Sequence, residues 1–231
     1  SNDTLGFFFI EHIAPITQFP HIQTFDGSGW NAGNGTSGNP GTFNTSDWEA
    51  LPAPQTADYA WQVGSALTPT FNTGPRWNRT RSGNYLYTEA SYGNNSPAAL
   101  FATTRCVDLS AMTSPVLTFW YHMFGADVNI LNVQVVPNGS NSWQTVTGAP
   151  ISGAQQSGEV DDWNFKMVDL SAYAGDVVKI RILARKTGSG DLADIAIDDL
   201  MIYNQPANDV GVSIVTSPLN SVNLANPQNV I

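Results

Sequence analysis

The sequence predicts an all-β protein, a sandwich of antiparallel strands, and three observations support this prediction. No window of a dozen residues repeats apolar side chains at the i, i+3, i+4 and i+7 spacing of an amphipathic helix. The apolar runs are short and end at turn residues. Charged residues make up only 12% of the 231 residues, about half of the usual ~25%, and Gly, Pro, Asn, Ser and Thr replace them.

Eight segments are expected to form strands. Apolar and polar side chains alternate with a period of two in the segment that begins at Ile130 and in the one that begins at Val177, as in strands with one solvated face. The expected strands cover residues 59–63, 84–89, 116–124, 130–136, 143–146, 164–170, 177–184 and 195–203.

The charge balance limits the classes of partner. The chain has 19 acidic and 9 basic residues and a net charge of −10, which disfavours nucleic acid and anionic membranes and is compatible with bound Ca²⁺. Cys106 is the only cysteine, so no internal disulfide forms, and we expect it to be a small core residue. The apolar run 5–10 is too short to span a bilayer, so no membrane insertion is expected.

The predicted domain organisation has three parts. Residues 1–18 are an N-terminal extension, residues 19–204 form the β-sandwich, and residues 205–231 are a linker and the truncated start of a following β module. A long segment, 26–57, is rich in Gly, Asn, Ser, Thr and Pro. We expect it to form ordered loops over the sandwich, because apolar side chains are spaced through it like anchors, namely Trp30, Phe43, Trp48 and Leu51.

Three motifs occur in an order that resembles a known family. The first runs from Gly74-Pro75 through Asn78-Arg79-Thr80 to the segment 83–90, "GNYLYTEA". The second is the aromatic run 118–125, "TFWYHMFG", and the third is the run 194–200, "DIAIDDL". Together they resemble the MAM domain, the module named after meprin and the receptor tyrosine phosphatases, over about residues 19–203.

The resemblance implies a jelly-roll β-sandwich of two antiparallel sheets. It also implies a non-catalytic domain that acts in adhesion or oligomerisation and can carry a structural metal ion. The chain departs from the family pattern where Thr24-Phe25-Asp26 replaces Cys-x-Phe-Glu and where Cys106 has no partner. These departures indicate a divergent, disulfide-free member from a secreted bacterial protein.

Two candidates for catalysis are weak. His122 lies in the aromatic strand, and alternation places Phe119 and Met123 on one face and Trp120 and His122 on the other. We interpret it as a structural histidine. Glu159-Val160-Asp161 matches the first two carboxylates of the Glu-x-Asp-x-x-Glu pattern of jelly-roll glycosidases, but the third is absent, so we interpret this segment as a turn.

A metal site is the strongest chemical hypothesis. Asp198 and Asp199 lie in an apolar strand, where a buried carboxylate is costly unless it is paired or bound to a metal. If the first and last strands are neighbours, Asp26 meets Asp198, and we expect the two to hold Ca²⁺ or Na⁺ with backbone carbonyls. The alternative is a buried aspartate that accepts backbone N–H bonds or pairs with an arginine such as Arg79.

Aromatic residues near turns indicate a second kind of site. Trp30, Trp77 and Tyr92 are candidates for platforms that bind sugar rings. The alternative is that these rings hold long loops against the sandwich.

The sequence therefore predicts a non-catalytic, extracellular adhesion or interaction module of a larger secreted bacterial protein, an accessory domain of a protease. Its expected partners are a protein or cell-surface glycan and the neighbouring domains of the parent protein. The alternative function is a carbohydrate-binding module of a polysaccharide-degrading enzyme. Neither a zinc motif nor Gly-x-Ser-x-Gly is present, which disfavours an enzyme.

Overall fold

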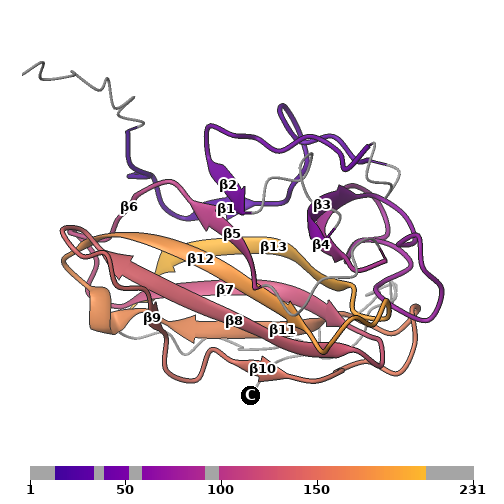
Figure 1. The fold of residues 1–231 in the computed structure, drawn as a ribbon. Helices are drawn as coiled ribbons and strands as arrows, with labels where there is room; N and C mark the ends of the chain where they lie inside the picture. Colours follow the sequence, from indigo (N-terminus) through magenta and orange to yellow (C-terminus); the bar gives the residue numbers. More distant parts are fainter. Residues whose placement is uncertain (1–13, 34–38, 52–58, 92–98, 207–231) are drawn as a thin grey trace, which may run out of the picture.

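The computed structural model describes residues 14–33, 39–51, 59–91 and 99–206, and they form two antiparallel sheets packed face to face (Figure 1). The β7 sheet contains, in spatial order, β11 (Asn164–Asp169), β7 (Pro115–Met123), β13 (Ile195–Asn204), β4 (Tyr85–Glu89) and β3 (Ala60–Gly64), with β1 (His21–Gln23) paired to β13. The β12 sheet contains β10 (Ile151–Ser152), β8 (Val128–Pro137), β12 (Val177–Lys186), β5 (Leu100–Thr104) and β2 (Trp48–Leu51), with β6 (Val107–Asp108) and β9 (Gln144–Thr145) beside them.

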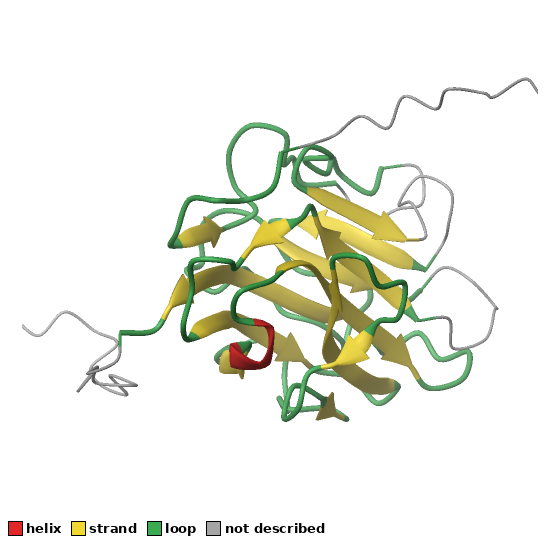
Figure 2. Ribbon diagram, turned by 90° about the vertical axis from the view of Figure 1, so that its left-hand side faces the viewer, coloured by secondary structure: helices red, strands yellow, loops and turns green. Residues whose placement is uncertain are grey.

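This architecture confirms the predicted all-β sandwich of two antiparallel sheets. The helical structure in the described residues is one short 3₁₀ turn, η1 (Ser171–Tyr173), drawn in red in Figure 2. The core lies between the sheets and is built from their inward-facing aliphatic and aromatic side chains. Burial of this apolar surface is the main favourable contribution to the fold.

Strand β7 contains most of the aromatic motif and lies near the centre of its sheet. Phe119 and Met123 face the core, whereas His122 lies on the opposite face against the Trp163 ring, with 5.8 Å between ring centroids. The predicted division of this strand into two faces is confirmed. The strand ends before Gly125, which has φ 138° and where a Cβ would lie 2.2 Å from the Leu192 carbonyl oxygen, so a residue with a side chain does not fit.

A second aromatic cluster covers part of the outer face of the β7 sheet. It consists of Tyr85, Tyr87, Trp163 and Ala196, with Trp120 packed against it. The Tyr85 ring meets the Trp163 ring edge to face at 5.8 Å. This half of the outer face is therefore buried beneath loops, which explains why all five residues of β4 are buried.

The structure adds strands that the sequence pattern did not predict. Five of them, β1, β2, β5, β6 and β10, have two to five residues and pair with longer strands. All eight expected strands are present with shifted ends; the expected 143–146 strand is reduced to the two residues of β9.

The long glycine-rich segment agrees in part with its expected role. Trp30, Phe43 and Trp48 are buried in the core, which confirms them as anchors. Leu51 is 48% exposed, so its assignment as an anchor is wrong; it is the last residue of an edge strand. Cys106 is only half-buried, and it lies outside the core in which it was expected.

The domain boundaries stay predictions. The described strands run from His21 to Asn204, inside the predicted sandwich 19–204. Ile16, from the predicted extension, also belongs to the core and bridges to Val107. The predicted β module that begins after the linker lies outside the described residues.

Candidate functional site

The loop of residues 76–84, between β3 and β4, brings the predicted site residues together. On one side, the Arg79 backbone N–H donates to the Asp198 carboxylate at 3.1 Å. On the other side, the Asn84 backbone N–H donates to the Asp26 carboxylate at 2.7 Å. Strand β1 pairs with β13, as expected for neighbouring first and last strands, so Asp26 and Asp198 lie on either side of this loop.

Asp198 is buried and Asp199 is not. The strand has a bulge at this point, where Asp199 has φ 45° and its backbone N–H donates to the Asp198 carboxylate at 2.8 Å. Asp199 forms an ion pair with Arg79. Burial, followed by repulsion from Asp199, raises the pKa of Asp198 to about 7, although the two backbone N–H donors counteract part of this.

Asn78 is a site residue that the sequence reasoning missed. Its amide nitrogen donates to the Ser82 carbonyl at 2.8 Å, but its side-chain carbonyl oxygen is buried and has no hydrogen-bond partner among the described residues. An unsatisfied buried oxygen is rare and costs free energy. Gly83 packs beside this group, since a Cβ there would lie 2.7 Å from an Asp26 carboxylate oxygen and 3.1 Å from the Asn78 amide nitrogen.

The oxygen atoms at this loop fit a hard cation better than a transition metal. Ca²⁺ and Na⁺ prefer oxygen donors. Three of them lie at this loop, namely the carboxylates of Asp26 and Asp198 and the side-chain oxygen of Asn78. Within the described ranges, no group of three or more His, Cys, Asp or Glu side chains is arranged to hold a metal. The same network also fits the alternative to a metal site, a buried aspartate that is satisfied by the protein itself. Asp198 accepts two backbone N–H bonds, and Arg79 forms an ion pair with the adjacent Asp199.

The three aromatic candidates have different environments. Trp30 is only 3% exposed and packs edge to face on Phe25 at 5.1 Å, so the expectation of an exposed platform is corrected: its ring anchors a loop. Trp77 is half-buried, with the guanidinium groups of Arg76 and Arg81 at 5.6 and 5.0 Å from its ring centroid. Tyr92 lies outside the described residues.

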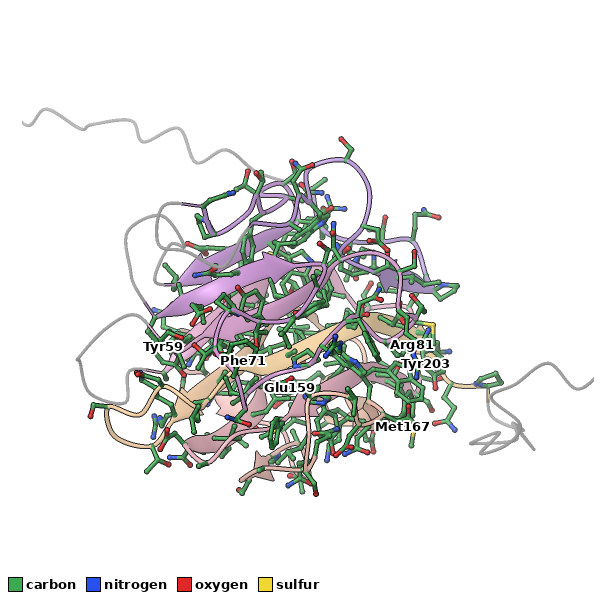
Figure 3. All side chains as sticks on the ribbon, turned by 90° about the vertical axis from the view of Figure 1, so that its right-hand side faces the viewer. Tyr59, Phe71, Arg81, Glu159, Met167 and Tyr203 are labelled. Atoms are coloured by element: carbon green, nitrogen blue, oxygen red, sulfur yellow. The ribbon has the colours of Figure 1, made fainter. Side chains whose placement is uncertain are left out.

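The uncovered half of the outer face of the β7 sheet carries an apolar strip, which the sequence reasoning did not identify. Paired residues run across four strands in the row Ile22–Met201–Thr118–Met167, and Trp120 and Phe165 form the next pair. We call the side chains of Ile22, Met201, Met167, Phe165, Trp120 and Tyr203 the outer strip. Figure 3 shows Met167 and Tyr203 on the same side of the molecule as Arg81.

The strip is more exposed than a structural role requires. Ile22 is 58% exposed, Met167 54% and Phe165 39%, and β11 is the edge strand of its sheet. Contiguous exposed apolar surface is typical of interaction sites. The sequence feature that could have revealed the strip is the alternation of Phe165 and Met167 with polar residues along β11, whose burial pattern leaves both side chains exposed.

The surroundings of His122 do not favour a catalytic role. It is fully buried, and in the described part of the chain neither ring nitrogen has a partner at hydrogen-bonding geometry. Burial lowers its pKa to about 4, and the nearby Gly158 backbone and Asp161 carboxylate offset only part of this effect.

Glu159 and Asp161 lie in a turn, as expected. The Glu159 carboxylate accepts the Asn72 backbone N–H at 2.7 Å, and the Asp161 carboxylate accepts those of Ser157 and Gly158. These hydrogen bonds give both carboxylates a structural role. In the part of the chain that the structure describes, no helix has the length and hydropathy needed to cross a bilayer.

A pocket beside β3 and β4 is too small for a typical ligand site. It has a volume of about 210 Å³ and is lined in part by Ser65, Leu67 and Tyr85. Ligand pockets usually span about 300–1,000 Å³. The exposed loop and the outer strip are therefore the candidate functional surfaces.

Part of the chain is similar to known proteins. It is 30% identical over 152 residues to Neuropilin-1a of Danio rerio, covering 63% of this chain and 15% of that protein. It is 29% identical over 163 residues to Thyroid hormone-induced protein B of Xenopus laevis, covering 64% of this chain and 20% of that protein. The matched region therefore spans a fifth or less of these relatives.

Solved structures give a distant likeness. The K1 cleaved adhesin domain of Lys-gingipain from Porphyromonas gingivalis W83 is 20% identical and covers 80% of this chain and 98% of that chain, with a TM-score of 0.44. The structure of TmCBM61 in complex with β-1,4-galactotriose is 15% identical and covers 68% and 88%, with a TM-score of 0.41.

The family model described as "MAM domain, meprin/A5/mu" matches residues 42–208, which is well over half of the chain. MAM domains are non-catalytic binding modules found in extracellular regions of membrane or secreted proteins. The match contains all three motifs that carried the resemblance, from Gly74 to Leu200. The chain belongs to the MAM domain family.

Proposed function

We propose that this chain is an extracellular adhesion module of a larger secreted bacterial protein, an accessory domain of a protease, and that it contacts a protein partner through the outer strip. The observation that carries the proposal is the strip itself, in which four strands contribute apolar side chains and Ile22, Met167 and Phe165 are exposed. Membership of a family of binding modules supports it.

The physical argument for the strip is the free energy of burial. Ile22, Met167 and Phe165 expose apolar surface that gains about 25 cal/mol for each Å² removed from water. Methionine adapts its shape to a partner more readily than a branched side chain. The strip therefore suits a protein surface better than a hydrated glycan.

Beads coated with the chain test this function on cell layers. Adhesion above that of albumin-coated beads is expected, and it is expected to be lost when the cells are treated with a protease but kept when their glycans are oxidised with periodate. Adhesion no greater than that of albumin-coated beads would contradict the adhesion function. Adhesion lost only after periodate would assign the partner to glycans instead.

A second function, carbohydrate binding, is favoured by one observation at Trp77. This half-buried indole lies next to two guanidinium groups on an exposed loop. Binding to a glycan array is expected to be lost in Trp77→Ala and kept in Trp143→Ala, a tryptophan on the other sheet's surface that contacts Arg181. Glycan binding that survives Trp77→Ala would contradict this assignment.

We also propose that Ca²⁺ or Na⁺ binds at the 76–84 loop. Asp26, Asp198 and Asn78 would hold it, and the ion would neutralise the buried carboxylate and satisfy the Asn78 oxygen. The ion would then stabilise the contact between β1, β13 and the loop. Melting curves with CaCl₂, with NaCl and with EDTA test the proposal; unchanged midpoints together with no metal by elemental analysis would contradict it.

A further inference from the structure

Three of the few cationic side chains of this acidic protein lie close together in one loop. The net charge is −10, and Arg76, Arg79 and Arg81 account for three of the nine basic residues within six positions. Of the others, Lys186 is fully buried and Arg105 pairs with Asp47. A group of cationic side chains on an otherwise acidic protein creates a local positive potential, which attracts anions.

The backbone of this loop is fixed by hydrogen bonds to Glu159 and Trp163 and by one within the loop. The Arg76 N–H donates to the Glu159 carbonyl at 2.8 Å, and the Trp163 indole N–H donates to the Trp77 carbonyl at 3.2 Å. Arg81 closes a turn by donating to the Asn78 carbonyl at 3.0 Å. Side chains on such a loop are presented to a ligand at a small cost in conformational entropy.

Arg81 is held in an unfavourable backbone conformation. Its φ is 64°, in the left-handed region that residues with a side chain rarely adopt. Strain of this kind persists where the surrounding structure enforces it, and it concentrates at functional positions. The conformation coincides with placement of the Arg81 guanidinium over the Trp77 ring.

Among the residues that the structure describes, two of the three arginines have no anionic partner. Arg79 is paired with Asp199 and lies over Trp120. Arg76 and Arg81 form no ion pair within the described ranges, and the nearby Glu159 and Asp161 carboxylates accept backbone N–H bonds elsewhere. The free N–H groups of a guanidinium match the paired oxygens of a carboxylate or sulfate.

We propose that the loop residues Arg76, Trp77 and Arg81 bind an acidic polysaccharide, and that the two guanidinium groups contact the sulfates or carboxylates on its sugar rings. The inference rests on the second proposed function, carbohydrate binding, and defines its ligand class. The Trp77 indole holds the two guanidinium groups close together through cation–π contacts, and these groups bind the anions.

An acidic peptide fits this loop less well. Peptides are usually recognised through main-chain hydrogen bonds as well as side chains. Here the backbone N–H groups of Arg76, Arg79 and Arg81 all donate within the protein, to Glu159, Asp198 and Asn78 respectively. The loop therefore offers side-chain donors and an indole, which suits a substituted sugar.

The test compares dextran sulfate with uncharged dextran, which has the same sugar backbone, and adds polygalacturonate as a carboxylated glycan. We expect the full chain to bind at least one charged polymer and not dextran, with an affinity that falls steeply as salt is added. The Arg76→Gln/Arg81→Gln variant is expected to bind about tenfold more weakly. The polymer that binds more tightly identifies sulfate or carboxylate as the preferred group.

The matched control is Lys179→Gln/Arg185→Gln, which removes two exposed charges from β12 in the other sheet. It is expected to bind within about twofold of the wild-type chain. Equal losses in both double variants would overturn the inference, as would no binding to either charged polymer.

Binding of poly-L-glutamate as tight as that of the charged glycans would reassign the site to acidic peptides. A neutral-glycan signal that depends on Trp77 but not on Arg76 and Arg81 would leave the carbohydrate-binding function in place and overturn only the anionic ligand class.

Discussion

His122 provides a quantitative prediction about the stability of the sandwich in acid. The side chain is fully buried against Trp163, and burial lowers its pKa to about 4 from an unfolded value of 6.5. The unfolded chain therefore binds the proton more readily than the folded protein. The stability that depends on neutral His122 is complete above pH 6.5 and is lost as the pH falls towards 4.

The magnitude follows from the two pKa values. Proton linkage gives a loss of about 2 kcal/mol at pH 5 and about 3 kcal/mol at pH 4, relative to pH 7.5. Replacement of the imidazole by an isopropyl group in His122→Leu removes this contribution. Buried Asp198 has a raised pKa and the opposite pH dependence, so the wild-type curve alone does not isolate the histidine.

The assay is urea unfolding at intervals between pH 4 and pH 7.5 for wild type and His122→Leu. The difference between their free energies of unfolding cancels the groups common to both proteins, and it should change by about 3 kcal/mol across this range. Met123→Leu, a core change with no titrating group, should give a flat difference. A flat difference for His122→Leu would refute the reasoning that this residue is buried neutral.

Three further predictions concern stability. Trp30→Ala is expected to reduce the free energy of unfolding by about 3–5 kcal/mol in chemical denaturation, because the Trp30 ring is buried in the core. Leu51→Ala, at an exposed position, should change it by less than about 0.5 kcal/mol. Similar effects of the two substitutions would contradict the burial of Trp30. Gly83→Ala is expected to lower the melting temperature, because it should reduce the free energy of unfolding by more than about 1 kcal/mol. The reason is that φ at this position is 111° and the new methyl group would meet the Asp26 carboxylate. An unchanged melting temperature would refute this contact. CaCl₂ is expected to raise the melting temperature of the wild type but not of Asp198→Asn by calorimetry, and an equal rise in both would exclude Asp198 as a ligand.

The sequence predicted those parts of the fold that carry their own signal. Strands β7, β12 and β13 have nine or ten residues and strong apolar patterns, so their existence is evident without knowledge of their neighbours. Strands β6 and β10 have two residues each and exist only because longer strands offer backbone partners. No periodicity can be read from two residues.

The candidate site was predictable where family motifs specify it and unpredictable where tertiary contacts do. The approach of Asp26 and Asp198 to one loop followed from the resemblance and from the pairing of β1 with β13. The unpartnered oxygen of Asn78 depends on how the loop folds, and a single asparagine in a loop gives no such signal. Trp30 lies among glycines and asparagines, so its sequence context allowed both a loop anchor and an exposed platform, and its packing on Phe25 supports the anchor.

The outer strip was missed for a different reason. Alternation on β11 shows that Phe165 and Met167 share a face, but it does not show which face the loops of the protein cover. That information comes from the aromatic cluster, which covers only the neighbouring half of the sheet.

Adhesion through the outer strip is the central claim, and the most direct measurement compares bead adhesion for Phe165→Ser/Met167→Lys and for Leu51→Ser/Val160→Ser. Both pairs replace exposed apolar residues, but only the first lies in the strip. Circular dichroism first verifies that both variants are folded. Adhesion should then fall to the level of albumin-coated beads for the strip variant and stay at the wild-type level for the control. Full adhesion by the strip variant would contradict the proposed mode of binding.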